Sequence, residues 1–267
     1  MLLQAALALL LVSGNALGDR PSTTTDFVRA DQTETAHVLQ TATTRYEKGG
    51  VRVDLLGAIH LADRPYYESL NKAFEDYEVL LFEMVGGRPA TPPLPKAEQG
   101  VADGQLGGLR DAMTKMAGFL QLASQLEVID YTRQNFVHAD LSVEEFEARQ
   151  EESQESIFGF ALAAAQNTEN QGLPQPNMAR MLSAILSGNA DGLKREMMKT
   201  LGESDDQIAT LAGDNIIISD RNVRCLEVLE RELAKGRTKV GIFYGAAHFP
   251  DLEKRLLAGG FRRTAQD

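Results

Sequence analysis

The chain has 267 residues, with 27 Lys and Arg against 38 Asp and Glu, which gives a formal net charge of −11 at pH 7. Binding to nucleic acid or to an anionic membrane surface depends on clustered positive charge, and neither is expected here because the chain is acidic and has no long basic run. The composition, 43% hydrophobic and 24% charged, is typical of a globular protein, and the single cysteine, Cys225, cannot form an intramolecular disulfide.

The first 18 residues carry no charged side chain and contain a mostly apolar stretch over residues 2–12. Ala16 and Gly18 are small residues placed as before a cleavage point, which is typical of a signal peptide, although the usual basic start is missing. The apolar part is too short to span a bilayer core of about 30 Å, and no later segment is long and apolar enough to do so. We therefore expect no integral membrane span in the mature chain. The protein is expected to be exported, periplasmic or extracellular, and to be cytoplasmic if residues 1–18 are not a signal peptide.

The chain from residue 19 to residue 82 predicts a lead-in followed by a βαβ unit. Residues 19–35 are rich in Thr, Asp and Ser and are expected to be flexible. A β-hairpin with a turn at residues 47–50 follows, and its second strand covers residues 51–56. Asp63 and Pro65 then mark the start of a helix, and the apolar run 79–82 is typical of a buried strand. This order predicts neighbouring parallel strands with a right-handed crossover.

A loop and a helical region follow. Residues 86–108 are dense in Gly and Pro and predict a long irregular loop. Helical periodicity then predicts five helices, at residues 109–127, 142–167, 178–186, 192–201 and 205–212. Ser142 and Glu145 have the spacing of a capping box at the start of the second of these helices.

The last part of the chain returns to an α/β pattern. A long helix is predicted at residues 216–234, a strand at 239–244, a helix at 252–257 and a final strand near Phe261. The predicted fold class is therefore α/β, with a central mixed or parallel sheet formed by both chain ends and a helical insertion, over about residues 109–212, as a cap. Residues 36–267 are expected to form a single domain.

Two copies of a Gly-x-x-His motif stand out, one ending at His60 and one at His248. Each copy follows an apolar strand directly and precedes a helix. Ligands of α/β sheets bind outside the carboxyl ends of parallel strands, where a glycine lets the backbone turn tightly. We therefore expect the two imidazoles to lie close together, although a single histidine in such a position is more often structural.

Glu83 directly follows the apolar run 79–82 and is expected at the same edge of the sheet. A buried carboxylate requires a partner, which would be a metal ion or an arginine such as Arg88 or Arg221. Two histidines and one carboxylate are also the minimal ligand set of a catalytic divalent ion. Neither an HExxH motif nor a cysteine cluster is present, so a metal is inferred from the expected convergence and not from local spacing.

With these motifs the chain resembles the TraB/GumN family over about residues 51–263. The resemblance includes the segment 82–88 with Glu83, the Arg221-Asn222 pair in the long helix, and the chain ending from Gly245 onward. The family is similar to the TIKI metalloproteases and, more distantly, to erythromycin esterase and ChaN-type folds. The resemblance implies a peptidase that depends on a divalent ion. It places His60, His248 and Glu83 at ligand or catalytic positions and Arg221 at a supporting polar position.

A hydrolytic mechanism would give each of these residues a role. His60, His248 and Glu83 would hold one divalent ion, Mn, Co or Zn, that activates water and polarises a carbonyl. Arg221 would stabilise the developing oxyanion. Glu83 is either a ligand or a general base that stays off the ion. Asn222 is expected to cap local backbone groups, with orientation of a ligand as the alternative.

The other histidines are given structural roles. His138 and Asp140 precede the capping box and are expected to organise the start of its helix, and His37 is expected to be exposed. A phosphate-binding glycine loop and a Gly-x-Ser-x-Gly elbow are both absent from the sequence, which disfavours nucleotide chemistry and an ordinary serine hydrolase.

Three functions remain open from the sequence. The first is a metal-dependent, peptidase-like hydrolase acting on a peptide or small-molecule substrate. The second is a metal-free, esterase-like hydrolase in which a histidine and Glu83 activate water. The third is a non-catalytic protein that binds haem, iron or a peptide through its histidines.

Overall fold

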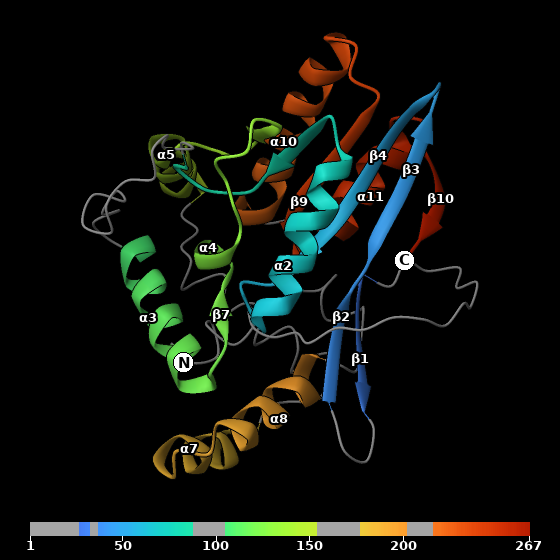
Figure 1. The fold of residues 1–267 in the computed structure, drawn as a ribbon. Coiled ribbons are helices and arrows are strands. Elements are labelled where there is room, and N and C mark those ends of the chain that lie inside the picture. Colours follow the sequence, from blue (N-terminus) through green and yellow to red (C-terminus); the bar gives the residue numbers. More distant parts are fainter. Residues whose placement is uncertain (1–26, 33–36, 88–104, 154–176, 202–215) are drawn as a thin grey trace.

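The computed structural model describes residues 27–32, 37–87, 105–153, 177–201 and 216–267 (Figure 1). The expected signal peptide, most of the loop predicted at 86–108 and the helix predicted at 205–212 lie outside these residues, as does the end of the helix predicted at 142–167. Residues 28–32 of the expected lead-in form a strand, β1 (Val28–Gln32), which pairs with β2 (His37–Thr41) in a two-stranded antiparallel sheet.

The centre of the molecule is a six-stranded mixed sheet, as the sequence predicted. Its strands, in spatial order, are β10 (Arg262–Gln266), β3 (Thr43–Lys48), β4 (Val51–Ala58), β9 (Lys239–Gly245), β6 (Val79–Phe82) and β8 (Phe136–His138). The last four strands are parallel, whereas β10 and β3 pair antiparallel with their neighbours. Strands from both ends of the described chain therefore build one sheet, with helices inserted between them.

The βαβ prediction is correct in its order and wrong in one respect. β4 leads through α2 (Arg64–Ala73) and the 3-10 helix η1 (Phe74–Asp76) to β6, and the two strands are parallel. They are not neighbours, because β9 lies between them and pairs with both. The physical reason is burial: Val240 to Tyr244 of β9 are all buried, and a strand that is apolar on both faces is most stable in the middle of a sheet.

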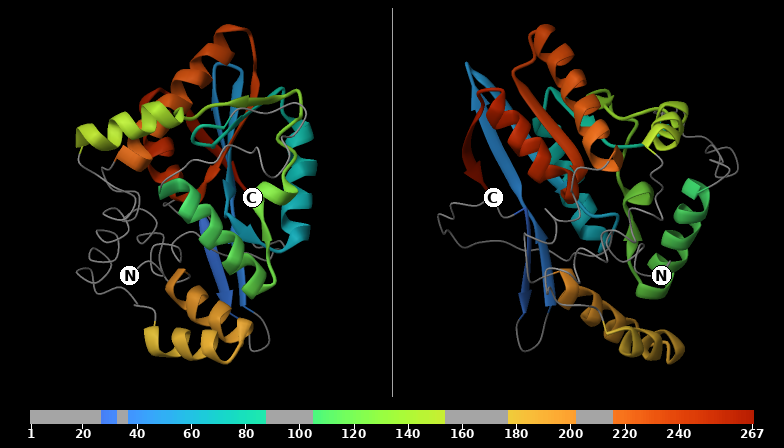
Figure 2. Two further views of the ribbon diagram at one scale, coloured as in Figure 1. Left: turned by 90° about the vertical axis from the view of Figure 1, so that its left-hand side faces the viewer. Right: turned by 180° about the vertical axis from the view of Figure 1, so that it is seen from behind.

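Helices cover both faces of the sheet (Figure 2). On one face α2 and η1 contribute Tyr67, Leu70 and Phe74 to a core with Leu56, Leu80, Phe82 and Phe243. On the other face α10 (Ile216–Ala234) and α11 (Phe249–Ala258) pack against the alternate residues of the same strands. Those residues include Val53, Leu55, Leu81, Ile242 and Tyr244. The period of two along each strand therefore divides the apolar side chains between two cores.

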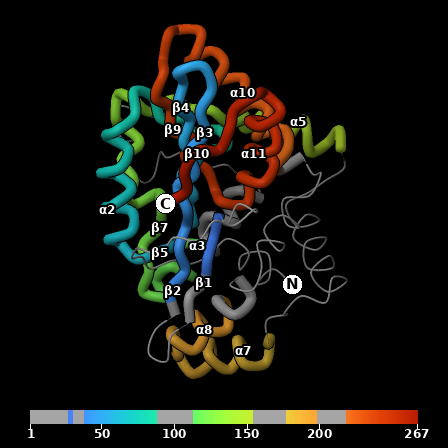
Figure 3. Tube along the Cα trace, turned by 90° about the vertical axis from the view of Figure 1, so that its right-hand side faces the viewer, coloured from blue at the N-terminus to red at the C-terminus, as the bar shows by residue number. Residues whose placement is uncertain are grey.

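The inserted region contains strands as well as helices. Its helices within the described residues are α3 (Gln105–Leu120), α4 (Gln125–Val128), α5 (Val143–Ser153), α7 (Met178–Leu186) and α8 (Ala190–Leu201). The helix predicted at 109–127 is interrupted where Gln121 has a φ of 56°, and β7 (Ala123–Ser124) there pairs with β5 (Leu61–Ala62). The edge strand β8 was not predicted. Figure 3 shows α7 and α8 beyond the end of β1 and β2, away from the central sheet.

Local signals for turns and helix ends were mostly correct. Gly49 and Gly50, both with positive φ, form the predicted hairpin turn, and Ser142 and Glu145 make both hydrogen bonds of the capping box. Asp63 occupies the N-cap of α2 but makes no capping hydrogen bond with its side chain. None of the helices in the described ranges has the combined length and hydropathy that crossing a bilayer requires.

Candidate functional site

Four parallel strands end at the same edge of the sheet, and a polar residue follows each end. His60 comes two residues after β4, Glu83 one residue after β6, and Asp140 two residues after β8. β9 ends at Gly245 and leads into the 3-10 helix η2 (Ala246–His248). Since the carboxyl ends of parallel strands meet at one edge, this topology delivers side chains from distant parts of the chain to one place.

The side chains of His60, Glu83 and His248 come together beside Gly245. A Cβ built on Gly245 would lie 3.3 Å from Glu83 Oε2, 3.9 Å from His248 Cδ2 and 4.0 Å from His60 Nε2. The glycine thus leaves room for three functional groups around one point of the backbone. The first motif begins within the end of β4 and places His60 just before β5, and the second begins at the last residue of β9 and places His248 at the end of η2.

Glu83 is held from two sides. Its Oε1 accepts a hydrogen bond of 2.6 Å from Arg221 Nη2 and lies 3.5 Å from His248 Nε2, and its Oε2 accepts one of 2.6 Å from the backbone N–H of Gly245. Burial raises the pKa of Glu83, but the positive charge of Arg221 and the nearby histidines outweigh it, so this pKa lies well below its ordinary value. Glu83 is therefore an ionised carboxylate at neutral pH.

Arg221 is the central cation of the site. It extends from α10 and is only 8% exposed. Its Nε and Nη2 donate hydrogen bonds of 2.9 and 2.6 Å to the two carboxylate oxygens of Asp140, which is 2% exposed. Burial lowers the pKa of Arg221, whereas Asp140 and Glu83 raise it, and the net direction is upward. One arginine thus bridges the buried Asp140 and the largely buried Glu83, and the alternative partner proposed for Glu83, Arg88, lies outside the described residues.

His248 is enclosed by protein and is only 3% exposed. Its Nδ1 lies 2.7 Å from Oδ1 of Asn222, and its Nε2 lies 3.4 Å from Nη1 of Arg221. Asn222 also donates hydrogen bonds from Nδ2 to the backbone oxygen of His248 and to Oδ2 of Asp251. The expected backbone contact of Asn222 is therefore present, together with a contact to the imidazole ring that the sequence did not indicate.

His60 is partly buried at the other side of Glu83. Its Nδ1 lies 3.2 Å from Oε1 of Gln125, and Gln125 Nε2 donates a hydrogen bond of 2.7 Å to the hydroxyl of Tyr131. The backbone N–H of Gln125 also donates to the carbonyl oxygen of His60. Burial lowers the pKa of His60, and the charge of Arg221 lowers it further while Glu83 opposes the shift. His60 is therefore a neutral imidazole at neutral pH.

Three of the site's polar residues were missed or misjudged by sequence reasoning. Asp140 was expected only to organise the start of α5, and Gln125 and Tyr131 were not considered. A signal for Asp140 would have been the strand β8, because a polar residue just after a parallel strand is a candidate for the site. β8 has only three residues, which is too short for a periodic pattern.

His138 lies at the same edge of the sheet but is used elsewhere. Its Nε2 lies 2.7 Å from the backbone oxygen of Met84, and its ring packs against Phe82. It therefore supports the turn after β6, a structural role different from the expected one at the start of α5. The side chain of His37 lies outside the described residues.

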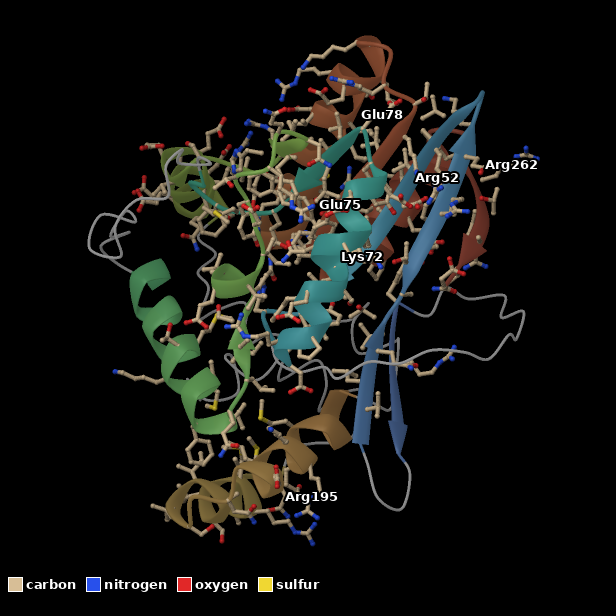
Figure 4. All side chains as sticks on the ribbon, viewed as in Figure 1. Arg52, Lys72, Glu75, Glu78, Arg195 and Arg262 are labelled. Atoms are coloured by element: carbon tan, nitrogen blue, oxygen red, sulfur yellow. The ribbon has the colours of Figure 1, made fainter. Side chains whose placement is uncertain are left out.

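A surface hollow of about 530 Å³ lies between α7 and α8. Figure 4 shows Arg195, one of its lining residues, on α8 at the opposite end of the molecule from Arg262. None of the residues expected at the site lines this hollow. We therefore base the chemistry on the edge of the sheet, where the ionisable groups are.

In their present arrangement these groups do not form a ready metal site. Among the residues that the structure describes, no group of three or more His, Cys, Asp or Glu side chains is arranged to hold a metal ion. Both carboxylate oxygens of Glu83 already accept hydrogen bonds. An ion would therefore have to compete with Arg221 for Glu83.

We compared the chain with models of protein families, with curated proteins and with solved structures, and none of them matched. Its function is therefore inferred from the side chains described above and from the sequence motifs.

Proposed function

We propose that the protein is a hydrolase of the TraB/GumN type that acts on a peptide or small-molecule substrate at the site formed by His60, Glu83, His248 and Arg221. The observation that carries this proposal is the convergence of two imidazoles and one carboxylate within 4.0 Å of a single point beside Gly245. These residues are far apart in the sequence, and a structural core has no need for them in one place. Hydrolases use such groups to activate water and to stabilise developing charge.

His60 is the group best suited to take a proton from water. Its imidazole is partly buried and its lowered pKa keeps it neutral, so a basic nitrogen is available. Glu83 is less suited as the base, because its pKa is far below neutral and two hydrogen bonds already stabilise its charge. Glu83 is better suited to anchor Arg221 and the backbone of Gly245.

A divalent ion held by His60, His248 and Glu83 is the first form of the proposal. The donor chemistry supports it, since an ion binds neutral imidazoles and an ionised carboxylate, and each ring has one nitrogen hydrogen-bonded to a side-chain amide, as ligand histidines often have. When bound, such an ion lowers the pKa of a water molecule and polarises a carbonyl. The charge of Arg221 beside Glu83 opposes this form.

A metal-free hydrolase is the second form, and the Arg221 contact favours it. The guanidinium already supplies the positive charge that Glu83 requires, with 2.6 Å between Nη2 and Oε1. In that form His60 alone activates the water and Arg221 supplies positive charge beside the reacting carbonyl, while the backbone N–H of Gly245 stays hydrogen-bonded to Glu83. Binding of haem, iron or a peptide without turnover would contradict the hydrolase and is an outcome of the test below.

Elemental analysis of protein purified without chelators distinguishes these forms. The metal-dependent form predicts about one Mn, Co or Zn per chain in the wild type and its loss in H60A and H248A, whereas the metal-free form predicts no bound metal in any of the three. H138Q is the matched control, because His138 lies at the same sheet edge but contacts Met84 and Phe82 instead of the site residues. Equal metal content in wild type, H60A and H248A contradicts a metal held by these histidines.

Turnover is then measured on a peptide library and on a chromogenic ester, with and without chelator. We expect hydrolysis in the wild type and in H138Q and a loss of at least about 100-fold in H60A, because general base catalysis contributes about 10²- to 10⁴-fold. Hydrolysis that survives chelation supports the metal-free form. Bound metal or haem without hydrolysis of either substrate contradicts the proposed activity and supports the binding protein.

A further inference from the structure

The ring of His248 meets a different kind of group at each nitrogen. Nδ1 lies 2.7 Å from the side-chain amide of Asn222, and Nε2 lies 3.4 Å from Nη1 of Arg221. A neutral imidazole carries one N–H and one lone pair, so the groups that face the two nitrogens decide which nitrogen is protonated. All three side chains are buried, and Asn222 has no exposed surface.

The orientation of the Asn222 amide follows from its other contacts. Its Nδ2 lies 3.1 Å from the backbone oxygen of His248 and 2.9 Å from Oδ2 of Asp251. Both of these atoms act as acceptors, since one is a backbone carbonyl oxygen and the other is the carboxylate oxygen that also accepts from Nε of Arg255. If the amide were reversed, its oxygen would face two acceptors, which would leave buried polar atoms unsatisfied. The oxygen of Asn222 therefore faces the ring.

An amide oxygen only accepts, so Nδ1 of His248 must carry the proton. The other nitrogen faces two groups of opposite kind, Arg221 Nη1 at 3.4 Å, which only donates, and Glu83 Oε1 at 3.5 Å, which only accepts, so the assignment rests on the contact with Asn222. We propose that Asn222 is a positioning residue that holds His248 in the Nδ1–H tautomer, so that the Nε2 lone pair faces Arg221 and Glu83 in the site.

A further chain of contacts keeps Asn222 in place. Asp251 Oδ2 accepts from Asn222 and also from Nε of Arg255 at 2.6 Å, and Arg255 Nη2 donates to Oγ of Ser219 at 3.2 Å. Asn222 and Ser219 lie on α10, whereas Asp251 and Arg255 lie on α11. Hydrogen bonds thus connect the two helices next to His248, which itself forms the N-cap of α11.

His60 is not fixed in this way, although it also faces an amide. The hydroxyl of Tyr131, which contacts Gln125 Nε2, can either donate or accept. The Gln125 amide can therefore be reversed without leaving an unsatisfied group at Tyr131, and either tautomer of His60 is then compatible with its neighbours. Of these two histidines, only His248 is therefore held in one tautomer by its neighbours.

Nuclear magnetic resonance of the ring nitrogens tests the tautomer directly. The full chain, labelled with ¹⁵N and free of added metal and substrate, is studied at a pH at which the imidazoles are neutral. Only four histidines contribute, and H248Q identifies the signals of His248. We expect a protonated, pyrrole-type Nδ1 and an unprotonated, pyridine-type Nε2. An Nε2–H tautomer in the wild type overturns the proposal, and this result does not depend on whether the protein is a hydrolase.

Variants test whether Asn222 is the cause. N222L removes the acceptor, and we expect the Nε2–H form to gain population. The exchanged pair N222D/D251N retains an acceptor at Nδ1 and a donor–acceptor contact between the helices, so we expect it to keep the Nδ1–H form. N135L is the matched control, because Asn135 makes two hydrogen bonds to backbone oxygens away from the site.

An unchanged tautomer in folded N222L overturns the role of Asn222, as does a changed tautomer in N135L, which would show that any such loss of packing moves it. If N222L does not fold, N222D/D251N decides, since an Nε2–H tautomer in that variant contradicts the proposal.

Discussion

Two carboxylates at the central sheet, Glu83 with 11% and Asp54 with 0% of the side chain exposed, are both paired with arginine, but their surroundings differ. Asp54 on β4 is fully buried and accepts hydrogen bonds from Arg45, Arg52 and Tyr77. Both arginines reach solvent, with 29% and 27% of their side chains exposed, and Figure 4 shows Arg52 on β4. Arg221 beside Glu83 has only 10% of its side chain exposed and serves a second carboxylate, Asp140.

The difference shows which feature indicates function. A buried carboxylate with an arginine partner occurs at both places, so the ion pair alone is consistent with a purely structural role. The Glu83 cluster also has two imidazoles and an open glycine at the ends of parallel strands. The Asp54 cluster has a phenol and two solvent-screened arginines, and no histidine is among its hydrogen-bond partners.

Loss of Arg221 is expected to have the largest effect. R221M leaves Glu83 and Asp140 buried without their cation, which typically costs about 3–5 kcal/mol of unfolding free energy. R52M should cost only about 1 kcal/mol, because Arg45 and Tyr77 still contact Asp54 and Arg52 is partly exposed. Urea denaturation measures both values.

The matched control for R221M is R224M, in the same helix. Arg224 pairs with Glu145 at the surface, and its loss should cost about 0–1 kcal/mol. If R221M is no more destabilising than R224M, Arg221 does not carry the charge balance of the site.

Two glycines of β9 give the next largest effect. A Cβ on Gly241, beside the Asp54 cluster, would lie 2.5 Å from Leu80 Cδ1 and 3.1 Å from Tyr77, whereas on Gly245 it would meet Glu83 first, at 3.3 Å. G241A should therefore lower the unfolding free energy by about 1–3 kcal/mol through overpacking. G245A should cost less stability but displace Glu83 slightly, and it should reduce hydrolysis by less than the roughly 100-fold expected for a 1 Å displacement.

The two glycine variants are compared by urea denaturation and by ester hydrolysis. Normal hydrolysis in G245A would mean that the space beside this glycine is not needed. Equal losses of stability in both variants would show instead that Gly245 is only a packing position.

Much of the fold could be predicted because its signals are local. The hairpin glycines, the capping box at Ser142 and the apolar run 79–82 each specify their own structure. The position of β9 between β4 and β6 could not be predicted in this way, because strand order depends on burial across the whole sheet. The three-residue strand β8 is likewise specified by its pairing with β6 and not by its own pattern.

The site shows the same division between local and distant information. His60, Glu83 and His248 could be singled out because each follows a strand end, which is a feature of the sequence. Gln125, which contacts His60, and Asp140, which pairs with Arg221, could not, since they belong to segments whose path over the sheet is set by tertiary packing. The amide contact of Asn222 with His248 depends on the angle between α10 and α11, which no short-range pattern specifies.

The smallest expected effect is a change in the pH dependence of stability at the Asp54 cluster. Burial raises the pKa of Asp54, but hydrogen bonds from Arg52 and Tyr77 outweigh it, so the folded-state pKa lies below the unfolded value of about 3.9. A group with a lowered pKa stabilises the fold above its unfolded pKa and loses this contribution as the pH falls toward the folded-state pKa. The wild type should therefore lose stability below about pH 4 more steeply than D54N, which has no carboxylate to protonate at this position.

Urea denaturation from pH 7 to pH 3 measures this difference between wild type and D54N, with D130N as a control for an exposed aspartate whose pKa is also lowered. Parallel curves for wild type and D54N would mean that the arginines of this cluster do not stabilise the charged form of Asp54, and the contrast with Glu83 would then rest on the histidines alone.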